Sequence, residues 1–147
     1  MRLHSSISRV VVALLCVAAM LSCMAPQRSF MSNIRGGEWC APVDIVYNNE
    51  DTVALRTISV VVRYNCDFKS NAMPVTLRLT APDGRSAEES CTILLRRPHA
   101  VAAVATVESV PYRVHNRMSQ SGYYIFTITP DSALRGVEAV GVEIVEE

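Results

Sequence analysis

The sequence has no excess charge of either sign, and it has few lysines and histidines. It holds fourteen basic and fourteen acidic residues among 147. Lys69 is its one lysine. A nucleic-acid-binding domain needs a basic face, and an interaction tail of one charge needs a run of like residues. Neither pattern is present, so we expect no nucleic-acid partner.

Side chains that commonly carry catalysis or bind metals are also sparse. Beyond residue 23 the histidines are His99 and His115, and neither has a cysteine or carboxylate at metal-ligand spacing. Glu88 and Glu89 are adjacent, so on a strand their carboxylates point to opposite faces and cannot act on one substrate. No glycine-rich phosphate-binding loop precedes a helix pattern. We therefore expect no enzyme activity, no catalytic residue, no cofactor and no bound metal.

No apolar run is long enough to cross a membrane. The longest, residues 10–21, has about a dozen residues, whereas a membrane-spanning helix needs ~20. Two arginines precede this run, and Ser22 and Cys23 close it. The arrangement is typical of a signal peptide cleaved in front of a cysteine that receives lipid. We predict that residues 1–22 are a lipoprotein signal peptide and that Cys23 carries diacylglycerol and a fatty acyl chain such as palmitate.

The alternatives are an ordinary secretory signal in which Cys23 is incidental, or a bare N-terminal anchor. Met20 stands where a lipobox more often has Leu, Val or Ile. We favour lipidation because nothing else explains a cysteine after a serine at the end of the apolar run. One acyl chain binds a bilayer weakly, with K on the order of 10⁴ M⁻¹, so several chains on one cysteine are needed for durable attachment. The protein would sit on a membrane without crossing it.

Cysteine is scarce beyond the lipidation site, where Cys40, Cys66 and Cys91 remain. Export places these thiols where they can oxidise, and their odd number allows at most one intramolecular disulfide. If the first two strands pair antiparallel, Cys40 and Cys66 lie at the same end, so we predict a bridge between them. The alternative is three buried thiols without a bridge, because free cysteine is among the most buried residue types.

The mature chain has twelve basic and fourteen acidic residues over about 125 residues, a size that suits one domain. Residues 23–37 are polar and contain Pro26 and two glycines, so we predict a flexible tether there. Residues 38–147 alternate between apolar and polar side chains with a period of two, as in strands. This pattern predicts one all-β domain, an antiparallel β-sandwich of about seven strands. The expected strands are 39–47, 55–64, 75–80, 90–96, 100–107 broken near Pro111, 122–129 and 137–145, with a turn at Pro82-Asp83-Gly84 and a helical turn at 131–134.

Several motifs occur in an order that resembles the gliding-motility lipoprotein GldH family of the Bacteroidota. After the lipobox come Trp39 at the start of the first strand, Arg63 at the end of the second, Gly122-Tyr123-Tyr124-Ile125-Phe126, and Leu134-Arg135-Gly136-Val137 before Val140-Gly141-Val142-Glu143-Ile144. The chain departs from the family in residues 97–117, which lack the glycine and tryptophan of a family loop.

The resemblance implies a lipid-anchored outer-membrane accessory protein of gliding motility and the type 9 secretion system. Its partners would be envelope motility or secretion proteins, and it implies no catalytic residues. Residues 24–28 lack the acidic run that marks surface export in many lipoproteins of this phylum, so we expect the protein to face the periplasm.

The candidate contact surface consists of Trp39, Tyr112, Tyr123 and Arg63. Exposed aromatics could form a sugar-binding platform, so the alternative function is a glycan-binding lipoprotein of the cell envelope, or they could contact a protein. Trp39 is more simply a core residue, and Arg63 a solvated side chain. Convergence of the three aromatics on one concave surface would favour glycan, and their scatter or burial would favour protein contact.

Overall fold

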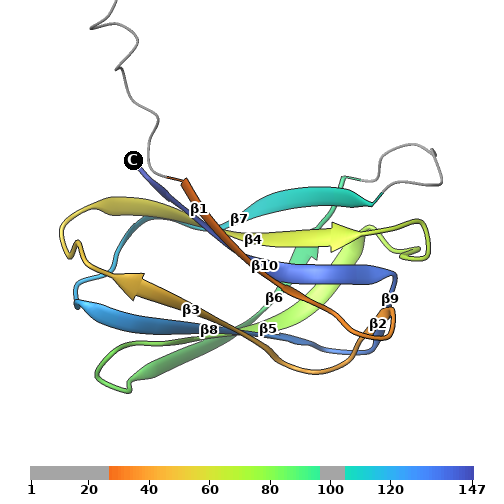
Figure 1. Cartoon of the computed structure of the whole chain (residues 1–147), viewed down its shortest axis with the longest axis horizontal. Helices are drawn as coiled ribbons and strands as arrows, with labels where there is room; N and C mark the ends of the chain where they lie inside the picture. Colours follow the sequence, from red (N-terminus) through yellow and green to blue (C-terminus); the bar gives the residue numbers. More distant parts are fainter. Residues whose placement is uncertain (1–26, 97–104) are drawn as a thin grey trace, which may run out of the picture.

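A computed structural model describes residues 27–96 and 105–147 of the chain (Figure 1). Every regular element in these ranges is a strand, which confirms the predicted all-β fold. The part of the chain that the structure describes contains no helix with the length and apolar character needed to cross a membrane. The strands are β1 (Gln27–Asn33), β2 (Glu38–Trp39), β3 (Val43–Asn49), β4 (Leu55–Tyr64), β5 (Ala72–Thr80), β6 (Ser86–Leu94), β7 (Thr106–Arg117), β8 (Gly122–Pro130), β9 (Leu134–Arg135) and β10 (Val137–Glu146).

The strands form a sandwich of two antiparallel sheets. The first sheet has the order β1-β10-β4-β7, and the second has the order β3-β8-β5-β6. A two-stranded ribbon of β2 and β9 lies at one end (Figure 1). The sandwich was predicted, although the described residues contain ten strands where about seven were expected.

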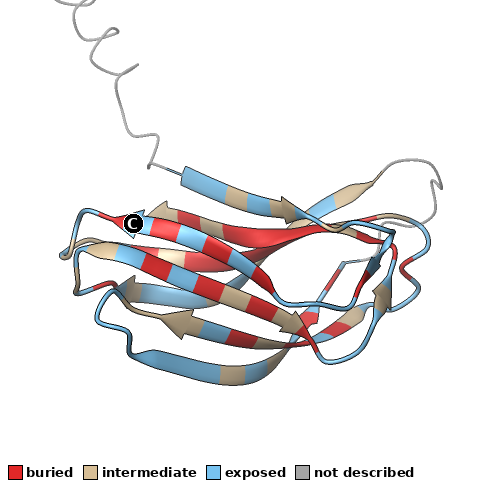
Figure 2. Cartoon of the chain, turned by 60° about the horizontal axis from the view of Figure 1, so that its bottom comes forward, coloured by how far each residue is buried: buried red, intermediate tan, exposed pale blue. Residues whose placement is uncertain are grey.

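The core lies between the two sheets and is built by alternation along each strand. In β8, Tyr124, Phe126 and Ile128 are buried, and the residues between them are not. Buried and exposed bands accordingly alternate along the strands (Figure 2). β4 differs because Ser59 and Val61, on its outer face, are buried as well. On this face Ser59 lies between Glu143 of β10 and Pro111 of β7, and Val61 lies between Gly141 and Ser109.

The predicted flexible tether over 23–37 is wrong over Gln27–Asn33. Gln27–Asn33 is the edge strand β1, which pairs with β10 from Gln27↔Val145 to Asn33↔Ala139. The ring of Phe30 packs edge-on against the ring of Tyr47, with 6.0 Å between centroids. The tether prediction failed because backbone pairing, rather than an alternating apolar pattern, supports most of this strand.

Three local predictions also need correction. The expected strand 39–47 is divided between β2 and β3. The expected helical turn at 131–134 is not helical, and its last residue, Leu134, begins β9. Pro111 does not break β7, although the register shifts beside it. β7 is an edge strand, where a residue without a backbone N–H is tolerated. The expected turn at Pro82-Asp83-Gly84 is present, and Gly84 has a φ of 83°.

The predicted disulfide between Cys40 and Cys66 is not formed. Both side chains are exposed free thiols, and Cys91 is a half-buried one. The prediction assumed that the first two strands pair with each other. Instead β3 pairs with β8, and β4 pairs with β10 and β7, so the strands on which the argument rested belong to different sheets.

Candidate functional site

The four residues predicted as a contact surface do not come together. Trp39 is a core side chain with 1% of its surface exposed, and its indole Nε1–H donates a hydrogen bond to the Ala41 carbonyl oxygen at 2.7 Å. Its polar atom is therefore satisfied inside the domain. The predicted use of Trp39 as a contact residue is wrong, and its alternative as a core residue is correct.

Arg63 is bound by side chains of its own sheet. Its Nη2 donates to Oδ1 of Asn33 at 3.1 Å, and its Nε lies 3.3 Å from Oε2 of Glu138. These contacts join β4 to β1 and β10 on the outer face of the first sheet. Because its charge already has a partner, Arg63 is a weak candidate for an anchor of a foreign carboxylate.

Tyr123 is the one predicted aromatic on an open surface. It is 66% exposed on β8, and Val46 and Ile125 beside it are 53% and 36% exposed. Val46 lies directly opposite Ile125 in the ladder between β3 and β8, and Tyr123 is opposite Asn48. We call Val46, Tyr123 and Ile125 the outer patch. It lies on the face of the second sheet that points away from the core.

Tyr112 lies elsewhere, in a cleft between the edge strands β6 and β7. This side cleft has a volume of about 220 Å³. Its lining combines apolar side chains with one carboxylate and one thiol: Val60, Glu89, Cys91, Thr92, Ile93, Val110, Pro111 and Tyr112. Two of the three aromatics are thus far apart in the fold and the third is buried, so they form no single sugar-binding platform.

The side cleft holds its polar groups in unreactive states. Arg113 Nη2 donates to Oε2 of Glu89 at 2.6 Å, and the Arg113 guanidinium lies over the Tyr112 ring, 5.0 Å from its centroid. Burial, with a smaller contribution from Glu89, raises the pKa of Tyr112 to about 12. Burial and the nearby carboxylates of Glu89 and Asp131 raise the pKa of the Cys91 thiol. At neutral pH the cleft therefore offers a thiol and a phenol, and not a thiolate or phenolate nucleophile.

Of the other titratable candidates, His115 is exposed at the end of β7 and pairs with the Glu147 carboxylate. Hydrogen bonds from Thr57 and from the His115 backbone lower the pKa of Glu147. Residues 27–96 and 105–147 contain no group of three or more metal-ligating side chains. Cys23 and His99 lie outside the described residues.

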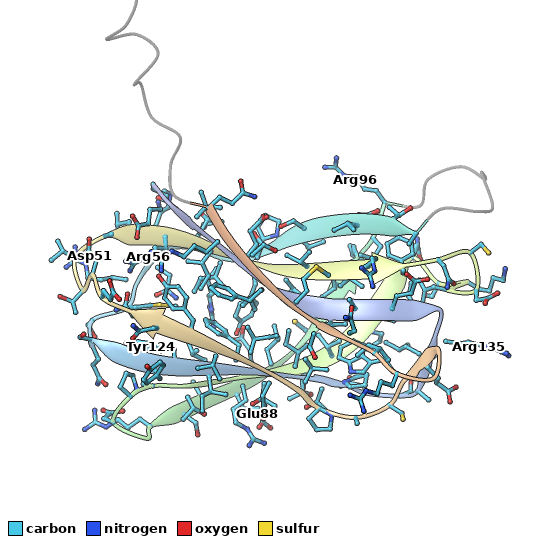
Figure 3. The ribbon with its side chains drawn as sticks, in the orientation of Figure 1. Asp51, Arg56, Glu88, Arg96, Tyr124 and Arg135 are labelled. Atoms are coloured by element: carbon cyan, nitrogen blue, oxygen red, sulfur yellow. The ribbon has the colours of Figure 1, made fainter. Side chains whose placement is uncertain are left out.

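Two buried polar residues were missed by the sequence analysis. Asn49 Nδ2 donates to the carbonyls of Met118 and Gln120 at 2.9 and 2.8 Å, which ties β3 to the β7–β8 loop. Arg56 has a side chain that is 1% exposed, and its Nη2 lies 3.1 Å from Oε1 of Glu146. Figure 3 shows Arg56 at the end of the sandwich that carries Asp51.

The period-two pattern itself could have found both residues. Arg56 precedes Ile58, Val60 and Val62 on the inner face of β4. In the same way Asn49 follows Val43, Ile45 and Tyr47 on the inner face of β3.

Comparisons with known proteins add little to this description. No family model matches the chain, and no curated protein is similar enough to match it. The solved structures that match include that of the infectious bursal disease virus Gx strain, with 12% identity and a TM-score of 0.42, and that of the infectious bursal disease virus VP2 subviral particle, with 13% identity and a TM-score of 0.41. Each match covers 83% of this chain and 30% of the viral chain. These values have no bearing on function, and the resemblance to the GldH family stays a prediction.

Proposed function

We propose that this protein is a lipid-anchored accessory of the outer membrane, of the GldH type, that acts by protein contact within a gliding-motility or type 9 secretion complex. In this proposal lipid on Cys23 holds the domain at the membrane, facing the periplasm, and the domain presents a surface to another envelope protein. It catalyses no reaction.

The outer patch is the observation that supports contact with a protein. An exposed tyrosine beside exposed valine and isoleucine side chains has the composition of an interface centre, where tyrosine is enriched. Asp44, Thr127 and Arg78 form the next row on the same face of the sheet, and they give the patch a polar border on that side. An apolar centre with a polar rim is the usual arrangement at protein interfaces. A scattered set of aromatics favours this function over glycan binding.

Anchoring is tested with Cys23→Ala. The parent protein is expected to partition with membranes and to gain the mass of its lipid at the N-terminus, because several acyl chains on one residue bind a bilayer durably. Cys23→Ala should lose that mass and appear in the aqueous fraction. Detergent phase partition and intact-mass measurement provide the readouts. A parent without added lipid mass, or a variant that still partitions with membranes, would refute the anchor.

Protein contact is tested with Tyr123→Ser. Captured from its native envelope after mild cross-linking, the parent should bring down subunits of the motility or secretion machinery, identified by mass spectrometry. Tyr123→Ser should lower their recovery about tenfold or more, since truncating a central interface tyrosine commonly costs at least 1.4 kcal/mol.

Leu94→Ser is the matched control for that experiment. Leu94 is 67% exposed on β6, as open as Tyr123, but it lies outside the outer patch. It should leave recovery unchanged. Equal recovery with all three proteins would contradict the role of the outer patch. A parent that binds envelope polysaccharide, and none of these subunits, would overturn the proposed function in favour of glycan binding.

A further inference from the structure

We infer that one end of the sandwich lies directly against the lipid bilayer, and that the opposite end points away from it. This inference rests on the proposed lipidation of Cys23. It follows from the length of chain between that residue and the first strand. The near end is defined here as residues 50–54 with Leu55 and Arg117. The far end is defined as residues 34–37, 65–71 and 131–136.

The link between lipid and domain is short because β1 is part of the sandwich. Met24, Ala25 and Pro26 are the residues between Cys23 and the first strand residue, Gln27. Four residue steps span at most about 14 Å even when fully extended. A flexible tether through Gly37 would have spanned several times that distance and would have allowed any orientation.

The place where the link meets the domain decides which end is near. Gln27 pairs with Val145, which in turn pairs with Thr57, close to the start of β4. Leu55 at that start lies opposite Arg117 at the end of β7. β1 then runs away from this end, and Asn33 reaches the row of Arg63 near the end of β4.

The two ends are well separated. β4 contains ten residues, and a strand rises about 3.3 Å per residue, so the ends are about 30 Å apart. Asp51 and Arg135 mark opposite ends of the molecule in Figure 3. The link is at most about 14 Å long and is attached near one end. The far end therefore cannot reach the bilayer unless the near end lies close to it as well.

The near end has side chains that suit a lipid surface. Val53 is 69% exposed and Leu55 is 39% exposed, so both can enter the boundary between headgroups and acyl chains. Arg117, exposed beside them, can bind a lipid phosphate. Asp51 accepts hydrogen bonds from the backbone N–H groups of Val53 and Ala54 at 2.7 and 3.1 Å, which fixes the loop that presents Val53. The far end instead exposes no large apolar side chain among residues 34–37, 65–71 and 131–136, and it would face the periplasm.

The orientation can be measured with single fluorescent labels, because Cys66 is an exposed free thiol at the far end. One protein keeps Cys66 and carries Cys40→Ser and Cys91→Ala. Its partner carries Cys66→Ser in addition and Val53→Cys at the near end. Both are purified in lipidated form and reconstituted into phosphatidylethanolamine and phosphatidylglycerol vesicles that contain a headgroup-linked quencher. The label at position 53 should be quenched several-fold more than the label at position 66.

A spacer variant separates the short link from other causes. Twelve Gly and Ser residues between Pro26 and Gln27 leave every described contact in place but lengthen the link about fourfold. The difference in quenching between the two labels should then fall at least twofold. Equal quenching of both labels without the spacer, as for a domain lying on its side, would overturn the inference. So would a difference that the spacer leaves unchanged.

Failure of the anchor gives a different result. If the parent carries no lipid mass and does not bind the vesicles, the proposed anchoring is wrong and the inference falls with it. If the parent is lipidated and bound but both labels are equally quenched, anchoring stands and only the orientation is wrong.

Discussion

Gly141→Ala is expected to detach β1 from the sandwich. Gly141 lies on β10 directly opposite Met31 of β1. A Cβ atom at this position would overlap the carbonyl oxygen of Phe30 and lie 2.7 Å from the Cα of Met31. These are backbone atoms, which cannot rotate away as a side chain would. The added methyl group therefore forces the two strands apart, and β1, as an edge strand, is the one free to leave.

We expect Gly141→Ala to lower the free energy of unfolding by about 2 to 3 kcal/mol, the upper range for overpacking. Hydrogen exchange of the amides in Gln27–Asn33 should rise far more than exchange in β4, because the rest of the first sheet can stay paired. Gly84→Ala is the control: Gly84 has a φ of 83° but nothing within 4 Å of an added Cβ. It should cost about 1 kcal/mol of backbone strain and leave exchange in β1 unchanged.

If hydrogen exchange of the β1 amides is unchanged in Gly141→Ala, the close approach of β10 to β1 is not needed for the pairing of these two strands. If instead β1 leaves as expected, residues 27–37 become the flexible tether that the sequence suggested. The variant then also provides a long link without any insertion.

Arg56→Ala should be the most damaging substitution of a charged residue, with a loss of about 3 kcal/mol. The Arg56 side chain is almost completely buried, and its guanidinium lies 3.1 Å from Glu146. Removing one partner of a buried ion pair costs 3 to 5 kcal/mol, because the other charge is left without compensation. The Glu146 side chain is 34% exposed and keeps some hydration, which places the loss at the lower end of that range. Denaturant unfolding monitored by Trp39 fluorescence measures it.

Arg56→Met separates packing from charge. Methionine keeps the volume of the aliphatic stem that packs in the interior, and it removes the Arg56 Nε, a buried atom without a hydrogen-bond partner among the described residues. We expect a smaller loss than for Arg56→Ala, because methionine keeps the packing of the aliphatic stem while both variants leave Glu146 without its partner. An Arg56→Met loss as large as that of Arg56→Ala would show that the ion pair, rather than packing, is responsible.

The strands that the sequence predicted well are those that bury one complete face. β4 matches the predicted range 55–64, and β8 and β10 differ from 122–129 and 137–145 by one residue. Each presents a row of large apolar side chains at every second position, and this periodicity is a local property of the sequence. β1 could not be predicted in the same way. Phe30 alone anchors it to the core cluster, and the rest of its stabilisation comes from a partner strand far away in the sequence.

The candidate contact residues show a similar limit. A sequence gives the face of a strand on which a side chain lies, but it does not give the side chains that lie beside it. Tyr123 was correctly expected on the surface, opposite in direction to Tyr124. The salt bridge of Arg63 with Glu138 joins two strands far apart in the sequence, so it could not be anticipated. The separation of Tyr112 from Tyr123 likewise depends on which strand belongs to which sheet.

If the chain is exported as proposed, the pairing of the first sheet also sets an order for its folding. β10 lies between β1 and β4, so residues 137–146 form the middle of the sheet that the earliest strand joins. A chain that emerges from a translocation pore from its N-terminus would present β1 and β4 long before their shared neighbour arrives. Such long-range pairing folds slowly, because the intervening chain must first be closed into a loop. In the proposed export the domain would therefore stay unfolded for most of its passage, and β1 would pair with β10 only when residues 137–146 have crossed.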